Sequence, residues 1–369
     1  MSATGAMVAF ALDWAMFLAG LGVTAPPNRF TQRECWEAVR NSSFLAALKP
    51  RSQWLLEKIL CGENGIAARH FVLQSPEKIF DLTPDAMHAR FAEYAPALAA
   101  KAARRALDAA GCLADEIDAV LISTCTGYLC PGLTSYVGEK IGLRKNVLAL
   151  DLVGQGCGAA LPNLRTADML LASGRAEKVL SICVEICSAA FFLDDDPGVL
   201  ISACLFGDGA GAAVLSKAPK QISGRQVEWK FSSSRLAPDK RDALRFSHKN
   251  GMLRNVLLPE VPQIAGLEAV NLFSESLAGA QITREKIRGW IFHTGGRDVL
   301  VSLRGKFALA DFDLRHSSSV LRDFGNISSP TVFFVLERAL RDTVPDGLWW
   351  MSAFGAGFSC HGALLDVKS

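Results

Sequence analysis

Cys157 is the residue best placed in the sequence for nucleophilic chemistry. It lies in the segment DLVGQGCGAALPNL, where a predicted strand ends at Val153, glycines form a tight turn and a helix is expected to begin at about Cys157. The free N–H groups and the positive dipole end of a helix start favour the thiolate, the nucleophilic form of cysteine. Gly156 and Gly158 leave room for a thioester to approach the backbone. A cysteine of an apolar chain can also be a small core residue, but this turn favours a nucleophile.

Two further polar residues lie beside glycines in the second part of the chain. His293 ends the apolar segment GWIFH and precedes two glycines, and Asn326 follows Gly325 in RDFGNISSP. Either residue could be structural, the histidine bonded to loop carbonyls and the asparagine capping a helix. The pair Gly325-Asn326, however, aligns with Gly156-Cys157 in what looks like a duplicated chain. Two related halves would bring these helix starts face to face, so the three residues are candidates for one site.

Alternating strands and helices are expected to position these residues. Apolar runs at 118–125, 146–154 and 178–185 predict buried strands. The Ala-rich segment 94–111 predicts a helix that ends at Gly111, and 161–174 predicts another that ends at Gly174. Strands and helices that alternate in this way indicate an α/β layered fold.

Three weak internal matches in the same order indicate that the chain is duplicated. The matches pair 116–124 with 286–294, Gly156-Cys157 with Gly325-Asn326, and 205–215 with 353–365. The polar, charge-rich segment 217–250 separates the two sets. We therefore expect an N-terminal half over 1–220, which carries Cys157, and a C-terminal half over 221–369, which carries His293 and Asn326.

Cys157, His293 and Asn326, in this order and with these flanks, resemble the Cys-His-Asn triad of the thiolase-like condensing enzymes. More narrowly, the chain resembles the type III polyketide synthases, the chalcone synthase-like family. The segments that carry this resemblance are TAPPNRFTQ, STCTGYLCPG, LFGDGAGA, HTGG, FGNISS and FGAGF. The resemblance implies a thiolase-like α/β fold, with duplicated βαβαβαββ halves in a five-layered αβαβα arrangement.

The resemblance also implies a reaction and its substrates. The expected reaction is iterative decarboxylative Claisen condensation of malonyl-CoA onto an acyl starter held on Cys157. His293 and Asn326 would donate hydrogen bonds to the enolate formed by loss of CO₂. The starter would come from acyl-CoA or an acyl-carrier protein, and the product would be of the pyrone or resorcinol type. The family implies a homodimer and requires no metal and no redox cofactor.

Other site positions follow from the resemblance alone. They comprise a gatekeeper at Phe206, further substrate or cavity positions at Ala190, Cys125, Cys130 and Phe354, and CoA-binding positions at Arg51 and Lys58. Phe206 could instead be an ordinary core aromatic, and the two basic residues could lie on a solvated helix face.

The chain departs from the plant chalcone synthases at several of these positions. It has Asn255 in place of a second gatekeeper Phe, Ala190 in place of a Thr, Cys130 in place of an interface Met and Ala356 in place of a Pro. These differences favour the bacterial alkylpyrone and alkylresorcinol synthases. Smaller side chains favour a medium or long fatty acyl starter over an aromatic one.

Composition excludes other classes of protein. The 39 basic and 37 acidic residues nearly balance and form no basic run, which argues against a nucleic-acid or anionic-membrane partner. The ten cysteines are scattered without a CxxC pair, which indicates no metal site and a reducing, cytoplasmic compartment. The apolar stretch 5–23 has no basic segment before it, so we expect a buried first strand with a leading extension rather than membrane insertion.

Two alternative functions remain open at the level of sequence. Ketoacyl-ACP synthase III of fatty acid synthesis also has a Cys-His-Asn triad, although its histidine motif typically reads like HQAN rather than the HTGG found here. A catalytically silent binding protein with a thiolase fold is the other alternative. The intact Cys157, His293 and Asn326 argue against it.

Overall fold

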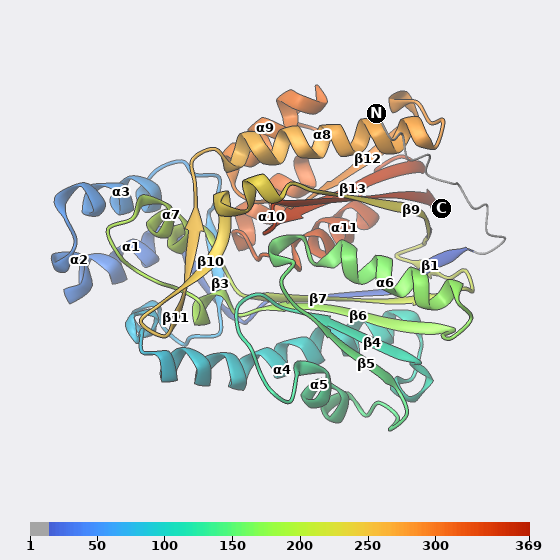
Figure 1. Ribbon diagram of the computed structural model, residues 1–369, viewed down its shortest axis with the longest axis horizontal. Coiled ribbons are helices and arrows are strands. Elements are labelled where there is room, and N and C mark those ends of the chain that lie inside the picture. The colour runs from blue at the N-terminus through green and yellow to red at the C-terminus, as the bar shows by residue number, and fades with distance from the viewer. Residues whose placement is uncertain (1–14) are drawn as a thin grey trace.

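The computed structural model describes residues 15–369, which form five layers (Figure 1). Ten strands make one continuous sheet in the order β12-β13-β14-β9-β1-β7-β6-β4-β5, with β8 paired to β9. The two halves of this sheet lie one above the other in Figure 1, joined where β1 pairs with β9. Helices α6 and α11 contact strands of both halves and therefore form the middle layer. Helices α4 and α8 cover the two outer faces, so the predicted αβαβα arrangement is confirmed.

The N-terminal half contributes five strands and four helices. Its strands are β1 (Met16–Thr24), β4 (Ala119–Ser123), β5 (Leu148–Leu152), β6 (Lys178–Glu185) and β7 (Gly209–Ser216). Its helices are α4 (Pro84–Ala110), α5 (Leu133–Ile141), α6 (Ala160–Ala172) and α7 (Pro197–Leu205). Strand β4 is parallel to β5 and β6, whereas β7 is antiparallel to β6 and β1.

The C-terminal half repeats most of this pattern. Its strands are β9 (Arg225–Leu236), β12 (Ile287–Phe292), β13 (Gly347–Gly355) and β14 (Ser359–Lys368). Its helices are α8 (Val261–Gly279), α9 (Arg297–Phe307), α10 (Arg315–Phe324) and α11 (Thr331–Arg341). Within residues 15–369 this half has no strand that corresponds to β5. The division of the chain at residue 220 stays a prediction.

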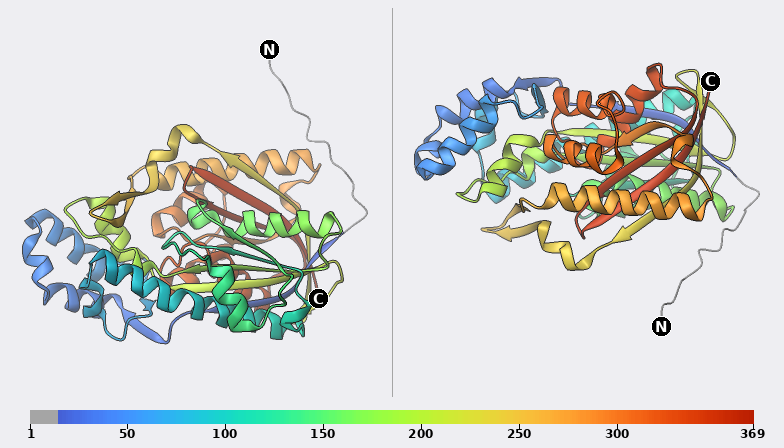
Figure 2. Two further views of the ribbon diagram at one scale, coloured as in Figure 1. Left: turned by 60° about the horizontal axis from the view of Figure 1, so that its bottom comes forward. Right: turned by 90° about the horizontal axis from the view of Figure 1, so that it is seen from above.

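Smaller elements project from one end of the layered body (Figures 1 and 2). They are α1 (Gln32–Arg40), α2 (Ser43–Ala47), α3 (Pro50–Cys61), the pair β2 (Asn28–Thr31) and β3 (Ala68–Phe71), and the hairpin β10 (Leu244–Lys249) and β11 (Met252–Leu257). Helix α3 packs on α7, and α7 packs on β11. The short strand β8 (Gln221–Ile222) completes the set of strands.

Small residues explain why α4 packs directly on the sheet. The helix carries a row of buried alanines, and β1 presents glycines to it. A Cβ at Gly20 would lie 2.1 Å from the carbonyl oxygen of Ala106, so only glycine allows this approach. Thr83 caps the start of the helix, and Gly111 ends it in the left-handed conformation. The predicted helix end at Gly111 is therefore confirmed, although the helix begins earlier, at Pro84.

The predicted strands agree with the structure except in one respect. The strand predicted at 178–185 is β6, with the same bounds, and 118–125 contains β4. The prediction that the strand within 146–154 is buried is wrong, because β5 is largely exposed and Leu148 is 44% exposed. The reason is that β5 is the last strand of the sheet and pairs only with β4. An apolar run does not reveal whether its strand lies at an edge.

The apolar N-terminal stretch includes β1, all nine residues of which are buried. The expected buried first strand is thus confirmed, whereas its leading extension over 1–14 lies outside the described residues. Among the helices of residues 15–369, none is long and apolar enough to cross a membrane.

Candidate active site

Cys157 lies in a tight turn between β5 and α6. The turn is a single 3₁₀ turn over Gly156–Gly158, and the α-helix begins at Ala160, three residues later than the sequence predicted. Gly156 has a φ of 54°, which glycine adopts without strain. From the other half, Gly355 approaches this turn so closely that a Cβ on it would lie 3.0 Å from the Cys157 amide nitrogen. The end of β13 therefore holds the Cys157 turn in place.

The surroundings of the Cys157 thiol favour its protonated form. Burial raises the pKa of Cys157 to about 12, and the nearby carboxyl group of Glu185 acts in the same direction. The Ser328 hydroxyl, 3.2 Å from the sulfur, partly opposes this rise. Burial therefore outweighs the stabilisation of thiolate expected from the helix start. The thiolate therefore needs a nearby group that takes up its proton and carries the resulting positive charge.

His293 follows β12 and is 1% exposed. Its backbone N–H donates to the carbonyl of Ser352 on β13 at 2.9 Å, and its ring meets the Phe354 ring edge-to-face with centroids 5.1 Å apart. Burial lowers the pKa of His293 to about 3, because the charged ring loses its solvation. Within residues 15–369 the ring nitrogen Nδ1 has no hydrogen-bond partner. The imidazole thus has unused hydrogen-bonding capacity in a dry environment.

Asn326 is held by both backbone and side-chain hydrogen bonds. It is 2% exposed and forms an isolated parallel bridge with Phe206. Its Nδ2 donates to the carbonyl of Gly295 at 3.3 Å, and its Oδ1 accepts from the Ser328 amide at 2.8 Å. Helix α11 begins only at Thr331, so Asn326 is not a helix cap. Its amide group is fixed in orientation beside the loop that follows His293.

The three predicted residues converge on one region without direct side-chain hydrogen bonds among them in the described part of the chain. Ser328 links the Asn326 side chain to the Cys157 sulfur. Strand β13 contacts both the Cys157 turn, through Gly355, and the His293 backbone. The two halves thus bring the thiol, the imidazole and the amide to the same region, where the halves meet.

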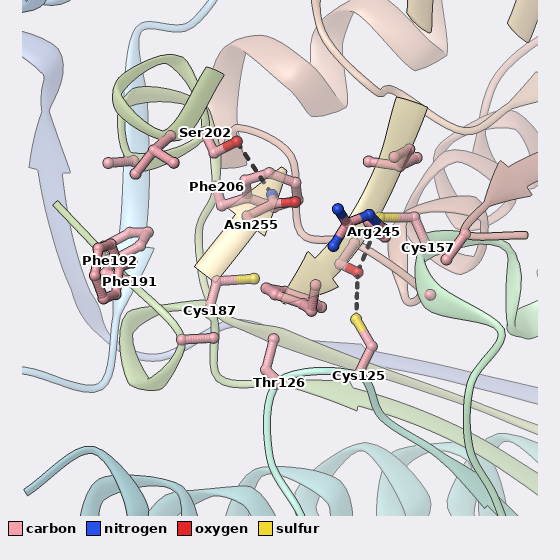
Figure 3. A pocket seen from close by; sticks show the side chains of 18 residues that line it. Cys125, Thr126, Cys157, Cys187, Phe191, Phe192, Ser202, Phe206, Arg245 and Asn255 are labelled. Carbon is pink, nitrogen blue, oxygen red and sulfur yellow. Dashed lines mark hydrogen bonds between the residues drawn. The ribbon is translucent and has the colours of Figure 1, made fainter. Parts of the chain in front are cut away.

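A pocket of about 630 Å³, including the space open at its mouth, adjoins Cys157 (Figure 3). Of the predicted positions, Cys157, Cys125, Ala190 and Phe206 line it, as do Asn255 and Ala356. The remaining lining residues are Thr126, Gly156, Cys187, Phe191, Phe192, Val199, Ser202, Ala203, Leu244, Arg245, Phe246 and Ser328. His293, Asn326 and Phe354 do not line it, and Phe354 packs against the His293 ring.

The other predicted site residues lie away from this pocket. Arg51 and Lys58 are exposed on α3, where the Lys58 ammonium lies 4.7 Å from the centre of the Trp54 ring. Cys130 is exposed in the loop between β4 and α5. None of the three lines the pocket, so the described geometry does not connect them with Cys157.

Sequence reasoning missed a buried carboxyl group beside the thiol. Glu185, at the end of β6, is fully buried, and burial raises its pKa against the opposing effect of its hydrogen bonds. Ser329 Oγ donates to it at 2.5 Å, Thr126 Oγ1 at 2.9 Å and the Cys125 amide at 3.0 Å. Ser328 Oγ lies 3.3 Å from Glu185 and can give its one proton either to Glu185 or to Cys157. The sequence signal was a single charged residue that ends a buried apolar strand.

Arg245 was missed as well. It lies on β10 and lines the pocket, although nothing in its local sequence distinguishes it from other surface arginines. Among residues 15–369 there is no cluster of three or more His, Cys, Asp or Glu side chains suited to a metal ion.

Comparison with known families places almost the whole chain. Residues 7–219 match the model described as chalcone and stilbene synthases, N-terminal domain, and residues 229–366 match the corresponding C-terminal domain. Two curated relatives illustrate the range of similarity. A 3,5-dihydroxyphenylacetyl-CoA synthase of Amycolatopsis balhimycina is 30% identical over 277 residues, which cover 74% of each chain. A bisdemethoxycurcumin synthase of Oryza sativa subsp. japonica is 28% identical over 374 residues, which cover 95% of this chain and 92% of that protein.

Solved structures show the same fold. The crystal structure of PKS-I from the brown alga Ectocarpus siliculosus superposes with a TM-score of 0.86 at 25% identity, covering 96% of this chain and 98% of that one. A type III pentaketide synthase from Neurospora crassa gives a TM-score of 0.83 at 24% identity, with 96% and 100% covered.

Proposed function

Because the chain belongs to the chalcone and stilbene synthase family and is a type III polyketide synthase, we propose that Cys157 carries the acyl starter that it extends with malonyl-CoA. The observation that supports this assignment is the position of the Cys157 thiol at the wall of a largely apolar pocket. Two other thiols, of Cys125 and Cys187, line the same pocket. Of the three, only Cys157 lies in a glycine turn before a helix, whereas both Cys157 and Cys125 lie close to the Ser328 hydroxyl.

Acyl loading begins with transfer of the Cys157 proton to the neutral imidazole of His293. The two neutral groups become an ion pair, which lowers the cost of each charge in the buried site. The thiolate attacks the carbonyl carbon of the starter thioester, and the CoA thiolate leaves and takes up the proton held by His293, which returns to its neutral form. The starter is then held as a thioester on Cys157.

Extension uses the hydrogen-bond donors of His293 and Asn326. In malonyl-CoA the bond to the carboxylate carbon breaks, CO₂ leaves, and the electron pair remains as the enolate of acetyl-CoA. A donor N–H from each residue stabilises the enolate oxygen, and both side chains are already fixed by their surroundings. The enolate carbon attacks the acyl carbonyl on Cys157, and the thiolate is expelled. Transfer of the extended chain back to Cys157 permits another cycle.

The pocket supports an aliphatic starter. Its wall beyond Cys157 includes Phe191, Phe192, Val199 and Phe246, which favour an apolar chain. Three curated relatives are named 3,5-dihydroxyphenylacetyl-CoA synthases. The 3,5-dihydroxyphenyl group in that name is a ring of the resorcinol type. We propose a pyrone or resorcinol-type product here, as in bacterial alkylpyrone and alkylresorcinol synthases. The intermediate's own enol or carbanion would release it by attack on the thioester.

The working form of the enzyme is proposed to be a homodimer. The exposed strand β5 leaves backbone groups and apolar side chains free for a second copy, and Cys130 lies in the neighbouring loop.

CoA thioesters are the proposed substrates, with Arg51 and Lys58 near the CoA phosphates, and an acyl-carrier protein is an alternative donor. No metal or redox cofactor takes part in these steps. The ten free cysteines agree with a reducing, cytoplasmic compartment.

The test uses the purified full chain with malonyl-CoA and a series of acyl-CoA starters of increasing length, together with one aromatic starter. Mass spectrometry is expected to find acyl groups on Cys157 and products extended more than once. Singly extended products formed only on carrier protein would instead indicate a ketoacyl-ACP synthase III activity, and no acylation by any starter would indicate a silent binding protein. Turnover of the aromatic starter alone would reject only the aliphatic preference.

A further inference from the structure

The pocket beside Cys157 has one charged side chain in its lining. Of the eighteen lining residues in the described part of the chain, Arg245 alone is charged at neutral pH, and none is acidic. The remaining members are apolar, small, or carry a hydroxyl, thiol or amide group. In Figure 3 the Arg245 guanidinium lies on the Cys157 side of the pocket, away from Phe191 and Phe192. A lone cation in an otherwise largely apolar wall gives the pocket a preference for an anionic ligand.

The hairpin β10–β11 holds Arg245 in this position. Leu244 and Phe246, on either side of it, also line the pocket. Opposite Phe246 on β11 lies Asn255, which donates from Nδ2 to Ser202 Oγ on α7 at 3.1 Å. The hairpin wall is thus attached to the helix that forms another side of the same pocket.

The guanidinium of Arg245 is not neutralised by a buried partner. Its one acidic neighbour at ion-pair distance within residues 15–369 is Asp242, with Oδ1 2.9 Å from Nε. The Asp242 side chain is 74% exposed and that of Arg245 is 43% exposed, so solvent screens this pair and it is weak. A ligand can therefore compete for the guanidinium at little cost.

The chemistry of the ligand follows from the shape of the cation and from the reaction. A guanidinium presents parallel N–H groups that match the two oxygens of a carboxylate. The carboxylate of a malonyl extender is lost as CO₂, and an ion pair to it would stabilise the substrate more than the transition state. A carboxylate at the far end of the starter, by contrast, keeps its charge through every step. An ion pair between Arg245 and this starter carboxylate therefore strengthens binding of the starter and does not oppose decarboxylation of the extender.

We propose that Arg245 selects an aliphatic starter whose far end carries a carboxylate, that is, the monothioester of a dicarboxylic acid. The acyl end is bound to Cys157 and the free carboxylate pairs with Arg245. This inference rests on the proposed function, since it concerns the starter held on Cys157. The chain length of the starter follows from the distance that it must span within the pocket.

The test compares starters matched in length that differ only in the terminal carboxylate. Succinyl is paired with butyryl and adipoyl with hexanoyl, each as the N-acetylcysteamine thioester, which has no CoA phosphate for a basic residue to bind. Malonyl-CoA is the extender, and kcat/KM for extended products is measured by mass spectrometry. The wild-type chain is expected to prefer the carboxylated member of at least one pair by about tenfold or more, and the pair with the larger preference gives the starter length.

Variants at two arginines of the same segment decide the origin of this preference. Arg245→Gln is expected to lower the ratio of carboxylated to neutral turnover by about tenfold, and Arg245→Glu to favour 6-aminohexanoyl over adipoyl thioesters. Arg241→Gln, an exposed arginine outside the pocket, is expected to keep the wild-type ratio. An equal ratio in the wild type and Arg245→Gln, with both starters extended, would overturn the role of Arg245 and leave the proposed function intact. Failure of the wild type to load or extend any starter would overturn the proposed function itself.

Discussion

The two ends of the long sheet differ although the two halves share a pattern. Strand β5 ends the N-terminal half with an exposed face, and Val153 beyond it is 61% exposed. Strand β12 ends the C-terminal half, and five of its six residues are buried beneath contacts from α10 and α11. The open edge leads into the Cys157 turn, and the covered edge leads into His293. One half thus has an exposed edge, where we propose that a second subunit pairs, and the other gives its histidine a dry environment.

The two turns at equivalent positions of the halves also differ in how accessible their side chains are. Gly156-Cys157 borders the pocket, so its thiol can meet a substrate. Gly325-Asn326 is tied to the segment between α7 and β7 by the backbone bridge between Asn326 and Phe206, and the Asn326 side chain is buried and does not line the pocket. The duplication therefore provides two similar halves. The side chain at each equivalent position, and how deeply it is buried, decide what each turn can do chemically.

The largest expected effect comes from removing the thiol at the turn that borders the pocket. Cys157→Ala should abolish covalent acyl loading and lower polyketide formation by about a thousandfold or more, since no other group takes its role as nucleophile. The fold should persist, because alanine is smaller than cysteine. Labelled starter followed by mass spectrometry measures the loading. Cys187→Ala, in the same pocket, should cost less than about tenfold, and covalent loading of Cys157→Ala would disprove the assignment.

Removing the amide at the buried turn should have the next largest effect. Asn326→Ala should lower malonyl-CoA decarboxylation by about a hundredfold, the typical cost of one oxyanion donor, and should affect acyl loading less. His293→Ala should impair both steps, because it removes the proton acceptor as well as a donor. Release of labelled CO₂ measures decarboxylation, with the melting temperature as the control for folding. Normal CO₂ release by Asn326→Ala would remove this residue from the catalytic set.

A charge at the open edge tests whether the difference between the sheet ends produces a dimer. Val153→Glu should weaken the proposed dimer by about tenfold or more, because the symmetric interface would bury two unpaired charges. Sedimentation at micromolar concentration measures the change. Val301→Glu, at a 51% exposed position of α9, is the matched control in the other half and should leave the dimer intact. A monomeric wild type would contradict the proposed interface.

The smallest expected effect concerns the carboxyl group beside the thiol. Ionised Glu185 raises the pKa of Cys157, so Glu185→Gln should lower that pKa and increase the thiolate fraction at a given pH. Alkylation of Cys157 by iodoacetamide should become about threefold faster, with its pH profile displaced by about half a unit to lower pH. The gain is confined to pH values at which Glu185 is ionised. Glu177→Gln, on the surface, should leave the profile in place, and a displacement to higher pH would contradict the proposed repulsion.

Local sequence signals determined the elements and the identity of the candidate triad. Gly111 ends α4, and the apolar run at 178–185 is β6, because a helix stop and a buried strand each depend on neighbouring residues. The Gly-Cys pair at Cys157 and the Gly-Asn pair at Asn326 can each be read from a short segment, and their repeat appears when the two segments are aligned. These features required no knowledge of distant contacts.

Only the tertiary structure decided the environment of the site, because its contacts join residues far apart in the chain. Ser328 and Cys157 are separated by 171 positions, and Glu185 and Ser329 by 144. The exposed edge at β5 and the charge of Arg245 in the pocket likewise depend on which elements lie beside them. Burial sets the pKa of the thiol, and burial is a property of the assembled halves. The sequence by itself therefore determined which groups are present, whereas the packing of the two halves decided their protonation, their partners and their access to substrate.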